Sequence, residues 1–586
     1  MKFKPTNLLL GLFLVIEAGV LTFGLPPFQK FDETQHWHRA AALSRGQVFC
    51  QDGHFIIPTV LRDLGLKYQF LDVLEGNLKF QPGLLNWSER WSREELSQIS
   101  DIKRCDMNFL GYIPNSLGIA LASPTRNPLI MFYTSRIFGF IFFGLVLWWT
   151  LKHTKEKFHP LIWFYSLMPM IVHQVTVVSY DVVILSLVLP LTSLLLKKLD
   201  GEVLEKLDWI LIWGIITVLG IVKYVYLPLI LIFLVLEWDW NKTAEWKKKF
   251  IAKSIIGLVI VFGLVGAMFK FGKGEMFYPI FINPKIQLSL IISDPVYFGQ
   301  VMVNTFSEKW LLHISEMVGI MGWKNVPLNN NLVLIVMSVA AILVGQRLAK
   351  SFKKVESWKA TVSLLVLAGV IKLTTVIMYL IWSVPGNRVV EGIQGRYWLP
   401  MVPFAIIFIT ILIKNLKEVY WVRVIVIGVI IIMGLNSVWG TLNQRYWDWT
   451  GDWINGSSLI DNPVTETVEE QERLEVNKQM EWVTASGGRR VSGVAFEFLN
   501  KGKSIIVPYK YEIKDGNCLK VLAKGYLDPW QIQDNRLTVV KFKPVEAVGN
   551  RLCLSLTPLP LDLDGYQDRL TIKSINNQPV FTWLYY

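Results

Sequence analysis

Long, nearly uncharged apolar segments recur through the first three quarters of this 586-residue chain, and they constrain its fold more than any other feature. Several approach the roughly 20 apolar residues with which a helix crosses a bilayer. Hydrophobic residues make up 52% of the chain and charged residues only 18%, which excludes a large soluble enzyme of ordinary composition. We therefore expect a polytopic α-helical membrane protein.

The apolar segments predict about eleven transmembrane helices. The first, Leu8–Phe23, follows Lys2 and Lys4. Because no small-residue cleavage site comes after it, we interpret it as a retained crossing rather than a signal peptide. The other predicted crossings are Leu129–Leu151, Leu161–Val178, Val182–Leu196, Ile210–Val222, Tyr224–Leu236, Ile255–Phe271, Leu332–Val344, Thr361–Trp382, Leu399–Ile413 and Val422–Trp439.

Basic residues cluster in the short loops between these segments, and this pattern predicts the orientation of the chain. The stretch 210–236 is short for two crossings and long for one, with Lys223 in its middle. A hairpin there places every basic cluster on one, cytoplasmic side, and Lys223 near the outer surface. We therefore expect a plasma or inner membrane protein with a cytoplasmic N-terminus. The same clusters account for the formal charge of +13, so no nucleic-acid partner is expected.

This orientation divides the chain into two expected domains. Residues 1–442 form a transmembrane domain with large outer loops at 24–128 and 272–331, and residues 443–586 form an extracytoplasmic domain. Within 443–586 the apolar runs become short and alternating, with turn residues between them. That pattern predicts a mostly β, sandwich-like domain.

The four cysteines fit this division of the chain. Cys50 and Cys105 lie in the first outer loop, and Cys518 and Cys553 lie in the C-terminal domain. An even pair in each outer region predicts two disulfides in an oxidising compartment, with buried free thiols as the alternative. No Cys/His spacing typical of a metal site is present, so no metal ligands are predicted.

A pair of adjacent carboxylates opens the first outer loop. Asp32 and Glu33 come shortly after the first crossing and are followed by His36 and Arg39. A carboxylate at this place can deprotonate a hydroxyl group or hold a divalent ion. The alternative is structural: Asp32 caps a juxtamembrane helix, and Glu33 lies in its first turn.

Further polar residues lie at helix ends on the same predicted outer side. A lone cation at a helix end is usually an interfacial anchor. Together, however, a group of cations near one face suits a phosphate or pyrophosphate headgroup. This set comprises Arg136, Tyr180, Asp181, Lys223, Gln394, Arg396 and Tyr397.

One carboxylate, Glu17, falls inside the first predicted crossing. An intramembrane carboxylate is a candidate functional residue. The alternative is a protonated side chain in a hydrogen bond between helices.

Several short motifs follow one another in the first three quarters of the chain. They are Pro26-Pro27, Asp32-Glu33 with His36 and Arg39, Tyr112 with Pro114, Ser179-Tyr180-Asp181, Lys223 with Tyr226 and Pro228, and Gln394-Gly395-Arg396-Tyr397 with Pro400. Their order and spacing, over roughly residues 5–440, resemble bacterial domain-of-unknown-function family 2142. That family looks like a branch of the GT-C superfamily of polytopic glycosyltransferases, which use polyprenyl-phosphate sugar donors outside the cytoplasm. The C-terminal domain lies outside the resemblance.

The resemblance implies a GT-C-like fold for residues 1–442 and a role for each matching residue. Asp32 would be the catalytic base of an inverting transfer, and Glu33 would orient the site or the acceptor. The donor phosphate would be held by Arg396 and Lys223.

Other roles follow from the same resemblance. His36 and Arg136 would be weaker phosphate ligands. A second catalytic acidic residue is not identified from the motifs, and its candidates are Asp181, Asp294 and Glu316. No cofactor is required, although a divalent ion is compatible with the sequence. The implied partners are a polyprenyl-phosphate-linked sugar, a cell-envelope glycan acceptor and membrane lipid.

Two other functions remain open from the sequence. A transporter or flippase for a lipid-linked glycan predicts inverted repeats and charges near the bilayer midplane. A non-enzymatic, envelope glycan-binding membrane protein predicts that Asp32 and Glu33 are dispensable.

Overall fold

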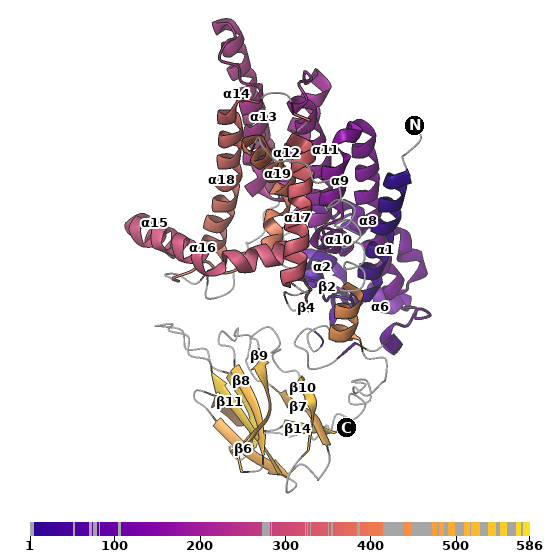
Figure 1. The fold of residues 1–586 in the computed structure, drawn as a ribbon. Helices are drawn as coiled ribbons and strands as arrows, with labels where there is room; N and C mark the ends of the chain where they lie inside the picture. Colours follow the sequence, from indigo (N-terminus) through magenta and orange to yellow (C-terminus); the bar gives the residue numbers. More distant parts are fainter. Residues whose placement is uncertain are drawn as a thin grey trace. The chain divides into compact units, whose positions relative to one another are not determined.

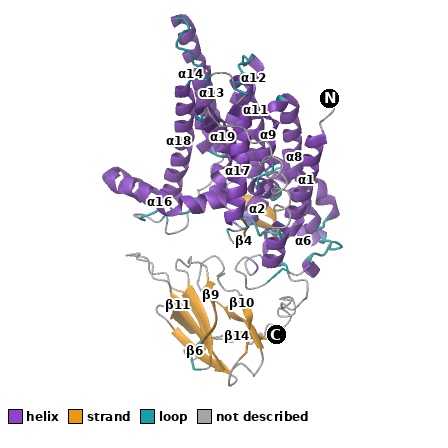
Figure 2. Ribbon diagram, in the orientation of Figure 1, coloured by secondary structure: helices purple, strands orange, loops and turns teal. Residues whose placement is uncertain are grey.

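The chain forms two compact units in the computed structural model. The first unit is Met1–Phe70 with Leu85–Arg445, and the second is Leu71–Leu84 with Tyr446–Tyr586. Figure 2 shows that helices dominate the first unit and strands the second. The structure describes residues 5–50, 53–68, 73, 79–80, 82–102, 107–271, 282, 284–322, 324, 326–328, 330–349, 351–352, 355–383, 387–413, 438–447, 472–476, 480–485, 490–497, 509–515, 517–527, 537–546, 551–558, 570–575, 578–579 and 581–585.

Six helices among the described residues are long and apolar enough to cross a membrane. Most of the α11 span is buried within the unit, whereas α14 exposes a broad apolar surface that includes Ile255, Val259 and Phe262. An exposed surface of this kind is suited to contact with lipid. The six spans are α1 (Pro5–Gly24), α8 (Pro128–His153), α11 (Asp181–Leu199), Ala244–Met268 within α14 (Ala244–Phe271), α18 (Ser357–Trp382), and Gly395–Leu412, which comprises η6 (Gly395–Met401) and α19 (Val402–Leu412) (Figure 1).

The predicted count of about eleven crossings is therefore supported only in part. Four further predicted crossings coincide with shorter or interrupted helices, and prolines mark two interruptions, at Pro169 and Pro228, because proline lacks the N–H that continues a helix. The last predicted crossing, Val422–Trp439, lies outside the described residues except for its final two positions. The shorter elements are α9 (His159–Ser166) with α10 (Pro169–Val175), α12 (Lys206–Val222), η5 (Tyr224–Leu229) with α13 (Ile230–Glu237), and the apolar part Val333–Ala349 of α17 (Asn330–Ala349).

Two long loops of the first unit carry their own secondary structure. In the second loop, residues 272–331, α15 (Pro284–Ser293) and α16 (Pro295–Val318) run across the direction of α17 and α18 (Figure 1). The described elements of the first loop, residues 24–128, are α2 (Glu33–Ser44), β1 (Phe55–Pro58), α3 (Thr59–Arg62), α4 (Leu64–Lys67), α6 (Arg93–Ser97), β2 (Ile99–Ile102), η2 (Phe109–Tyr112), α7 (Ile113–Ala122) and η3 (Ser123–Thr125), with η1 (Pro82–Leu84) assigned to the second unit. Those of the second loop are α15 (Pro284–Ser293), α16 (Pro295–Val318), β3 (Ile320–Met321), β4 (Val326–Pro327) and the start of α17.

The C-terminal unit contains three small antiparallel sheets in the part of the chain that is described. Their strand orders are β10-β7-β14, β6-β11-β8-β9 and β13-β12-β5. The prediction of strands is therefore met, but a sandwich is not established by these short sheets. The strands are β5 (Glu472–Val476), β6 (Met480–Ala485), β7 (Arg490–Glu497), β8 (Tyr509–Asp515), β9 (Val521–Leu527), β10 (Leu537–Glu546), β11 (Arg551–Pro558), β12 (Leu570–Ile575), β13 (Gln578–Pro579) and β14 (Phe581–Tyr585).

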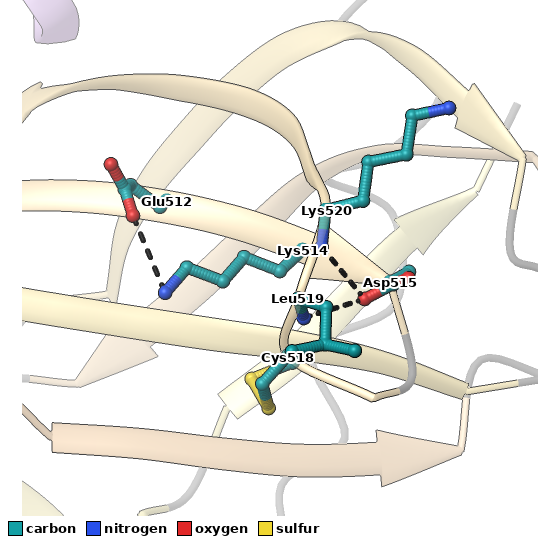
Figure 3. Close-up of a disulfide and its surroundings, with 7 residues drawn as sticks. Glu512, Lys514, Asp515, Cys518, Leu519 and Lys520 are labelled. Carbon is teal, nitrogen blue, oxygen red and sulfur yellow. Dashed lines mark hydrogen bonds and ion pairs between the residues drawn. A yellow bond between two sulfur atoms is a disulfide. The ribbon is translucent and has the colours of Figure 1, made fainter.

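A disulfide joins Cys518, in the turn between β8 and β9, to Cys553 on β11 (Figure 3). The carboxylate of Asp515 organises this turn, because it accepts the backbone N–H groups of Leu519 and Lys520 at 2.9 and 3.1 Å. Cross-linking across 35 residues restricts the unfolded chain and so stabilises the unit. In the first loop Cys50 is disulfide-bonded, and Cys105 lies outside the described residues.

The packing of α7 on α8 depends on a glycine and supplies a test of the first unit. A Cβ atom on Gly118 of α7 would lie 2.5 Å from the Thr134 carbonyl oxygen of α8, and backbone cannot easily move away. We expect Gly118→Ala to lower the free energy of unfolding by about 1–3 kcal/mol, as overpacking does. Thermal unfolding of the purified protein measures this change.

The matched control is Gly144→Ala, because a Cβ atom at that α8 position meets nothing within 4 Å. Its unfolding temperature is expected to stay close to that of the unsubstituted protein. Equal stability of the two variants would contradict the observed α7–α8 contact.

Candidate functional site

The connection between α1 and α2 places Asp32 at the start of the site. Asp32 has a left-handed backbone, with φ 61° and ψ 9°, which is strained for a residue other than glycine but tolerated by aspartate. It occupies the N-cap position of α2, yet its side chain makes no capping hydrogen bond. Instead, its carboxylate Oδ2 lies 3.5 Å from Nη2 of Arg396 and is partly exposed. The helix-capping alternative for Asp32 is therefore not the contact observed.

Asp181, the first residue of α11, lies between two buried cations. Its Oδ2 atom is 3.6 Å from Nη1 of Arg396, in η6, and 3.7 Å from Nζ of Lys30, in the α1–α2 connection. Lys223, at the end of α12, places its Nζ 3.4 Å from the centre of the Tyr397 ring. We call Lys30, Asp32, Asp181, Lys223 and Arg396 the charged cluster.

The charged cluster holds more hydrogen-bond donors than its own carboxylates satisfy. Nζ of Lys30, Nζ of Lys223, and Nε and Nη1 of Arg396 are buried without a hydrogen-bond partner among the described residues. The ion-pair distances of 3.5–3.7 Å exceed the roughly 2.7–2.9 Å of a charge-assisted hydrogen bond. Three cations face two carboxylates, so an anion with several acceptor oxygens, such as a phosphate, fits this arrangement in charge and in hydrogen bonding.

Burial perturbs both lysines, which lie outside the membrane-spanning segments. Burial and the nearby Arg396 together lower the pKa of Lys30 to about 7, against the attraction of Asp181. Burial lowers the pKa of Lys223 to about 7 as well, with Asp181 opposing the change. A bound anion would restore the charged form of both side chains.

Glu33 and Arg136 lie next to the charged cluster but bind each other. The Arg136 guanidinium donates to both Glu33 carboxylate oxygens, at 3.0 and 2.7 Å, and both side chains are fully buried. Glu33 also accepts the backbone N–H of Val178 at 3.0 Å. These contacts use the donors and acceptors that phosphate binding or acid–base chemistry would need, and they indicate a positioning role for the pair.

His36 borders the site, whereas Arg39 lies apart from it. Nδ1 of His36 is 2.7 Å from the Tyr112 hydroxyl, and its ring meets the Tyr180 ring edge-to-face at 5.0 Å. Lys223 lies 5.7 Å from the same Tyr180 ring, which links this aromatic group to the cluster. Arg39 instead donates to the carbonyl oxygens of three first-loop residues, Met107, Gln47 and Val48.

Gln394 and Tyr397 hold the backbone around Arg396. The Gln394 carbonyl accepts the Tyr397 N–H at 3.0 Å, and the Tyr397 carbonyl accepts the Tyr226 hydroxyl at 2.9 Å. Glu17 is buried in α1 with Oε2 unpartnered in the described part of the chain, and no contact places it in the charged cluster.

Of the three candidates for a second acidic residue, the structure places only Asp181 in the charged cluster. The Asp294 carboxylate caps α16 by accepting the Tyr297 N–H at 2.8 Å. Glu316, also on α16, accepts the backbone N–H of Gly395 at 2.8 Å. No group of three His, Cys, Asp or Glu side chains that suits a metal ion occurs among the described residues.

Lys30 is the cluster residue that the sequence analysis missed. It precedes Asp32 by two positions in the motif-bearing stretch, so its place in the sequence was the available signal. Its complete burial, which distinguishes it from an ordinary interfacial lysine, is visible only in the folded chain.

The fold and the charged cluster together define a membrane protein with several apolar helices and a buried site that carries several charged side chains. The chain belongs to the DUF2142 family of predicted membrane proteins, whose sequence profile matches residues 13–405. No curated protein and no solved structure matches the chain. The family assignment agrees with the membrane location and leaves the activity open.

The buried Glu33–Arg136 pair supplies one test. Glu33→Gln leaves the Arg136 charge uncompensated in the interior, so we expect it to destabilise the protein by about 3–5 kcal/mol. The double variant Glu33→Gln/Arg136→Met removes both charges and is expected to recover part of that loss. Thermal unfolding of both variants measures these changes in stability. A Glu33→Gln protein as stable as the unsubstituted one would exclude the structural role of the Glu33–Arg136 pair.

The two lysines supply a second test, which depends on pH. The pKa of each lysine is about 7 in the folded protein and about 10.5 in the free side chain. Between pH 7 and pH 10.5 the unfolded chain therefore binds more protons than the folded protein. The free energy of unfolding rises with pH over this range. A bound phosphate raises both pKa values again and must take up protons. We therefore expect the affinity for farnesyl phosphate to fall about tenfold or more between pH 7 and 9.

Isothermal titration in buffers of different ionisation enthalpy measures this proton uptake directly. The phosphate monoester does not contribute, because its second pKa is about 6. Lys30→Met is expected to flatten the profile, and a flat profile for the unsubstituted protein would contradict the expected linkage.

Proposed function

We propose that this protein is an inverting membrane glycosyltransferase that moves a sugar from a polyprenyl-phosphate donor to a cell-envelope glycan or lipid acceptor. The reaction takes place on the extracytoplasmic side, as in the GT-C superfamily that the sequence resembles. The observation that carries the proposal is the charged cluster, in which Lys30, Lys223 and Arg396 present unpaired donors beside Asp32.

The cations suit the leaving group of this reaction. When the bond between the anomeric carbon and the donor phosphate breaks, the electron pair leaves with the phosphate oxygen. Arg396 would bind two phosphate oxygens through its planar donors, and the two lysines would act as point charges. Donors arranged in advance, away from bulk water, stabilise such developing charge most effectively.

Asp32 suits the role of general base. Its carboxylate is partly exposed, unlike those of Glu33 and Asp181, so an acceptor hydroxyl has access to it. It would take the hydroxyl proton as the acceptor oxygen bonds to the anomeric carbon opposite the leaving phosphate, which inverts that carbon. Asp181 would hold Arg396 and Lys30 in place between turnovers.

The surroundings suit a lipid-linked substrate. The motif residues gather at the ends of α1, α11, α12 and the start of η6, where a headgroup meets protein, rather than along the middle of these helices. This distribution favours interfacial transfer over a transport path through the bilayer, for which charges near the midplane are expected. The C-terminal unit would bind the acceptor glycan.

Transfer in liposomes tests the proposal. Purified protein is given a panel of radiolabelled polyprenyl-phosphate sugars and envelope glycan acceptor. We expect Asp32→Asn to reduce transfer by about 10²–10⁴-fold while donor binding persists, as loss of a general base does. Asp63→Asn is the matched control, because Asp63 is a first-loop carboxylate that pairs with its neighbour Arg62 outside the cluster.

Three other results of this assay would each lead to a different conclusion. Transfer that survives in Asp32→Asn would move the base to another carboxylate, Asp181 first. Movement of labelled lipid between leaflets without transfer to any acceptor would replace the glycosyltransferase by a flippase. Glycan binding by a protein that neither transfers nor moves lipid would favour the non-enzymatic alternative.

A further inference from the structure

A second cluster of polar residues joins the second loop to η6, the turn that carries Arg396. The Glu316 carboxylate, near the end of α16, accepts the Gly395 N–H at 2.8 Å. The oxygen that accepts this N–H, Oε2, also lies 3.2 Å from Nδ1 of His313. The other oxygen, Oε1, lies 2.9 Å from Nζ of Lys324. Glu316 is almost completely buried. Burial alone raises the pKa of this carboxyl, but the hydrogen bonds from His313 and Lys324 outweigh it and hold the pKa below its usual range.

The backbone at Gly395 lies directly against α16. A Cβ atom there would come within 2.0 Å of the His313 carbonyl oxygen and 2.6 Å of the Met317 backbone nitrogen, so only glycine allows this approach. The His313 ring also packs edge-to-face on the Trp398 ring of η6 at 5.3 Å. The α16 end thus contacts η6 immediately before Arg396 and again two residues after it.

The hairpin that follows α16 extends this contact. Nζ of Lys324, between β3 and β4, also donates to the Ile393 carbonyl at 3.2 Å. At the same turn the Gly322 N–H lies 3.4 Å from Nε2 of His173 on α10. Gly322 and Lys324 both have positive φ, of 65° and 66°, which glycine adopts freely but which is strained for lysine, so contacts hold Lys324 in this conformation. One segment therefore contacts both α10 and the residues immediately before η6.

We propose that Glu316 is a positioning residue, which fixes the Gly395 turn and thereby aims the Arg396 guanidinium at Asp32 and Asp181. The second loop then controls the phosphate-binding geometry without touching the ligand. The inference rests on the proposed function only for the identity of that ligand. It assigns Glu316 a structural link to Arg396 in place of the acid–base role considered for it from the sequence.

The Arg396 side chain makes few close polar contacts of its own. Nε and Nη1 of Arg396 have no hydrogen-bond partner among the described residues, and its ion pairs measure 3.5 and 3.6 Å. The guanidinium also lies over the Phe31 and Tyr397 rings, at 5.4 and 5.6 Å, so all these contacts of the side chain are long. Its backbone carries the constraint, through Glu316 before it and the Tyr226 hydroxyl after it.

The test is a double-variant cycle in the full-length protein, with farnesyl phosphate as the probe. Arg396→Gln and Glu316→Leu are each expected to weaken binding by about tenfold, because each removes a hydrogen bond that involves a charged group. If Glu316 acts through Arg396, the double variant binds no more weakly than Arg396→Gln alone. Additive losses would overturn the inference.

Two further variants separate positioning from simple charge balance. Glu316→Leu/Lys324→Met removes both partners of the ion pair and leaves no unpaired lysine. Binding is expected to stay weak in this variant, and recovery of full affinity would overturn the inference. Glu308→Leu is the matched control, since Glu308 is an exposed α16 carboxylate paired with Arg388, and it should bind the probe normally.

Hydrogen exchange gives a measurement that is independent of any ligand. Amides of residues 393–401 are expected to exchange at least about tenfold faster in Glu316→Leu than in Glu308→Leu, because the Gly395 N–H loses its acceptor. Unchanged exchange would overturn the inference. If the unsubstituted protein does not bind the probe at all, the proposed function loses its support while exchange still decides the role of Glu316.

Discussion

The buried ion pair between Glu33 and Arg136 is the interaction on which the first unit depends. Arg136 donates to the carbonyl oxygens of Thr22, Leu25 and Pro26, at 2.8, 2.7 and 3.2 Å, as well as to Glu33. The carbonyl groups at the end of a helix have no partner in the helix itself, and an apolar environment offers no water in their place. One guanidinium therefore completes the end of α1, and its partner carboxylate fixes the start of α2 and the connection before α11 through Val178.

The Glu33–Arg136 ion pair explains how a chain with so little charge can hold the charged cluster in its interior. The α1–α2 connection that carries Lys30 and Asp32 is fixed at both ends by the same ion pair. Asp181 follows Val178 by three residues, so the pair also sets the start of α11 relative to Asp32. The left-handed backbone at Asp32 is tolerated because its neighbours determine the path of the chain on either side.

The two carboxylates of the acidic pair have opposite environments, although they are adjacent in the sequence. Asp32 is partly exposed and faces Arg396 at 3.5 Å, whereas Glu33 is fully buried and engaged by Arg136 and Val178. Asp32 precedes the first helical residue and has a left-handed backbone, whereas Glu33 begins the helix, so the two side chains leave the chain in different directions. This division of roles supports Asp32 as the reactive group of the proposed transfer, with Glu33 supporting the fold.

The sequence by itself determined the membrane class, the positions of nearly all the apolar helices and most residues of the cluster. Apolar length and charge distribution are local properties, and motif order let Asp32, Asp181, Lys223 and Arg396 be named before any contact was known. Only the tertiary structure decided that Lys30 joins them, that Glu33 and Arg136 bind each other, and that Glu316 reaches Gly395. These contacts join residues that are often more than a hundred positions apart, so their burial and pairing follow from packing, which no local pattern of residues encodes.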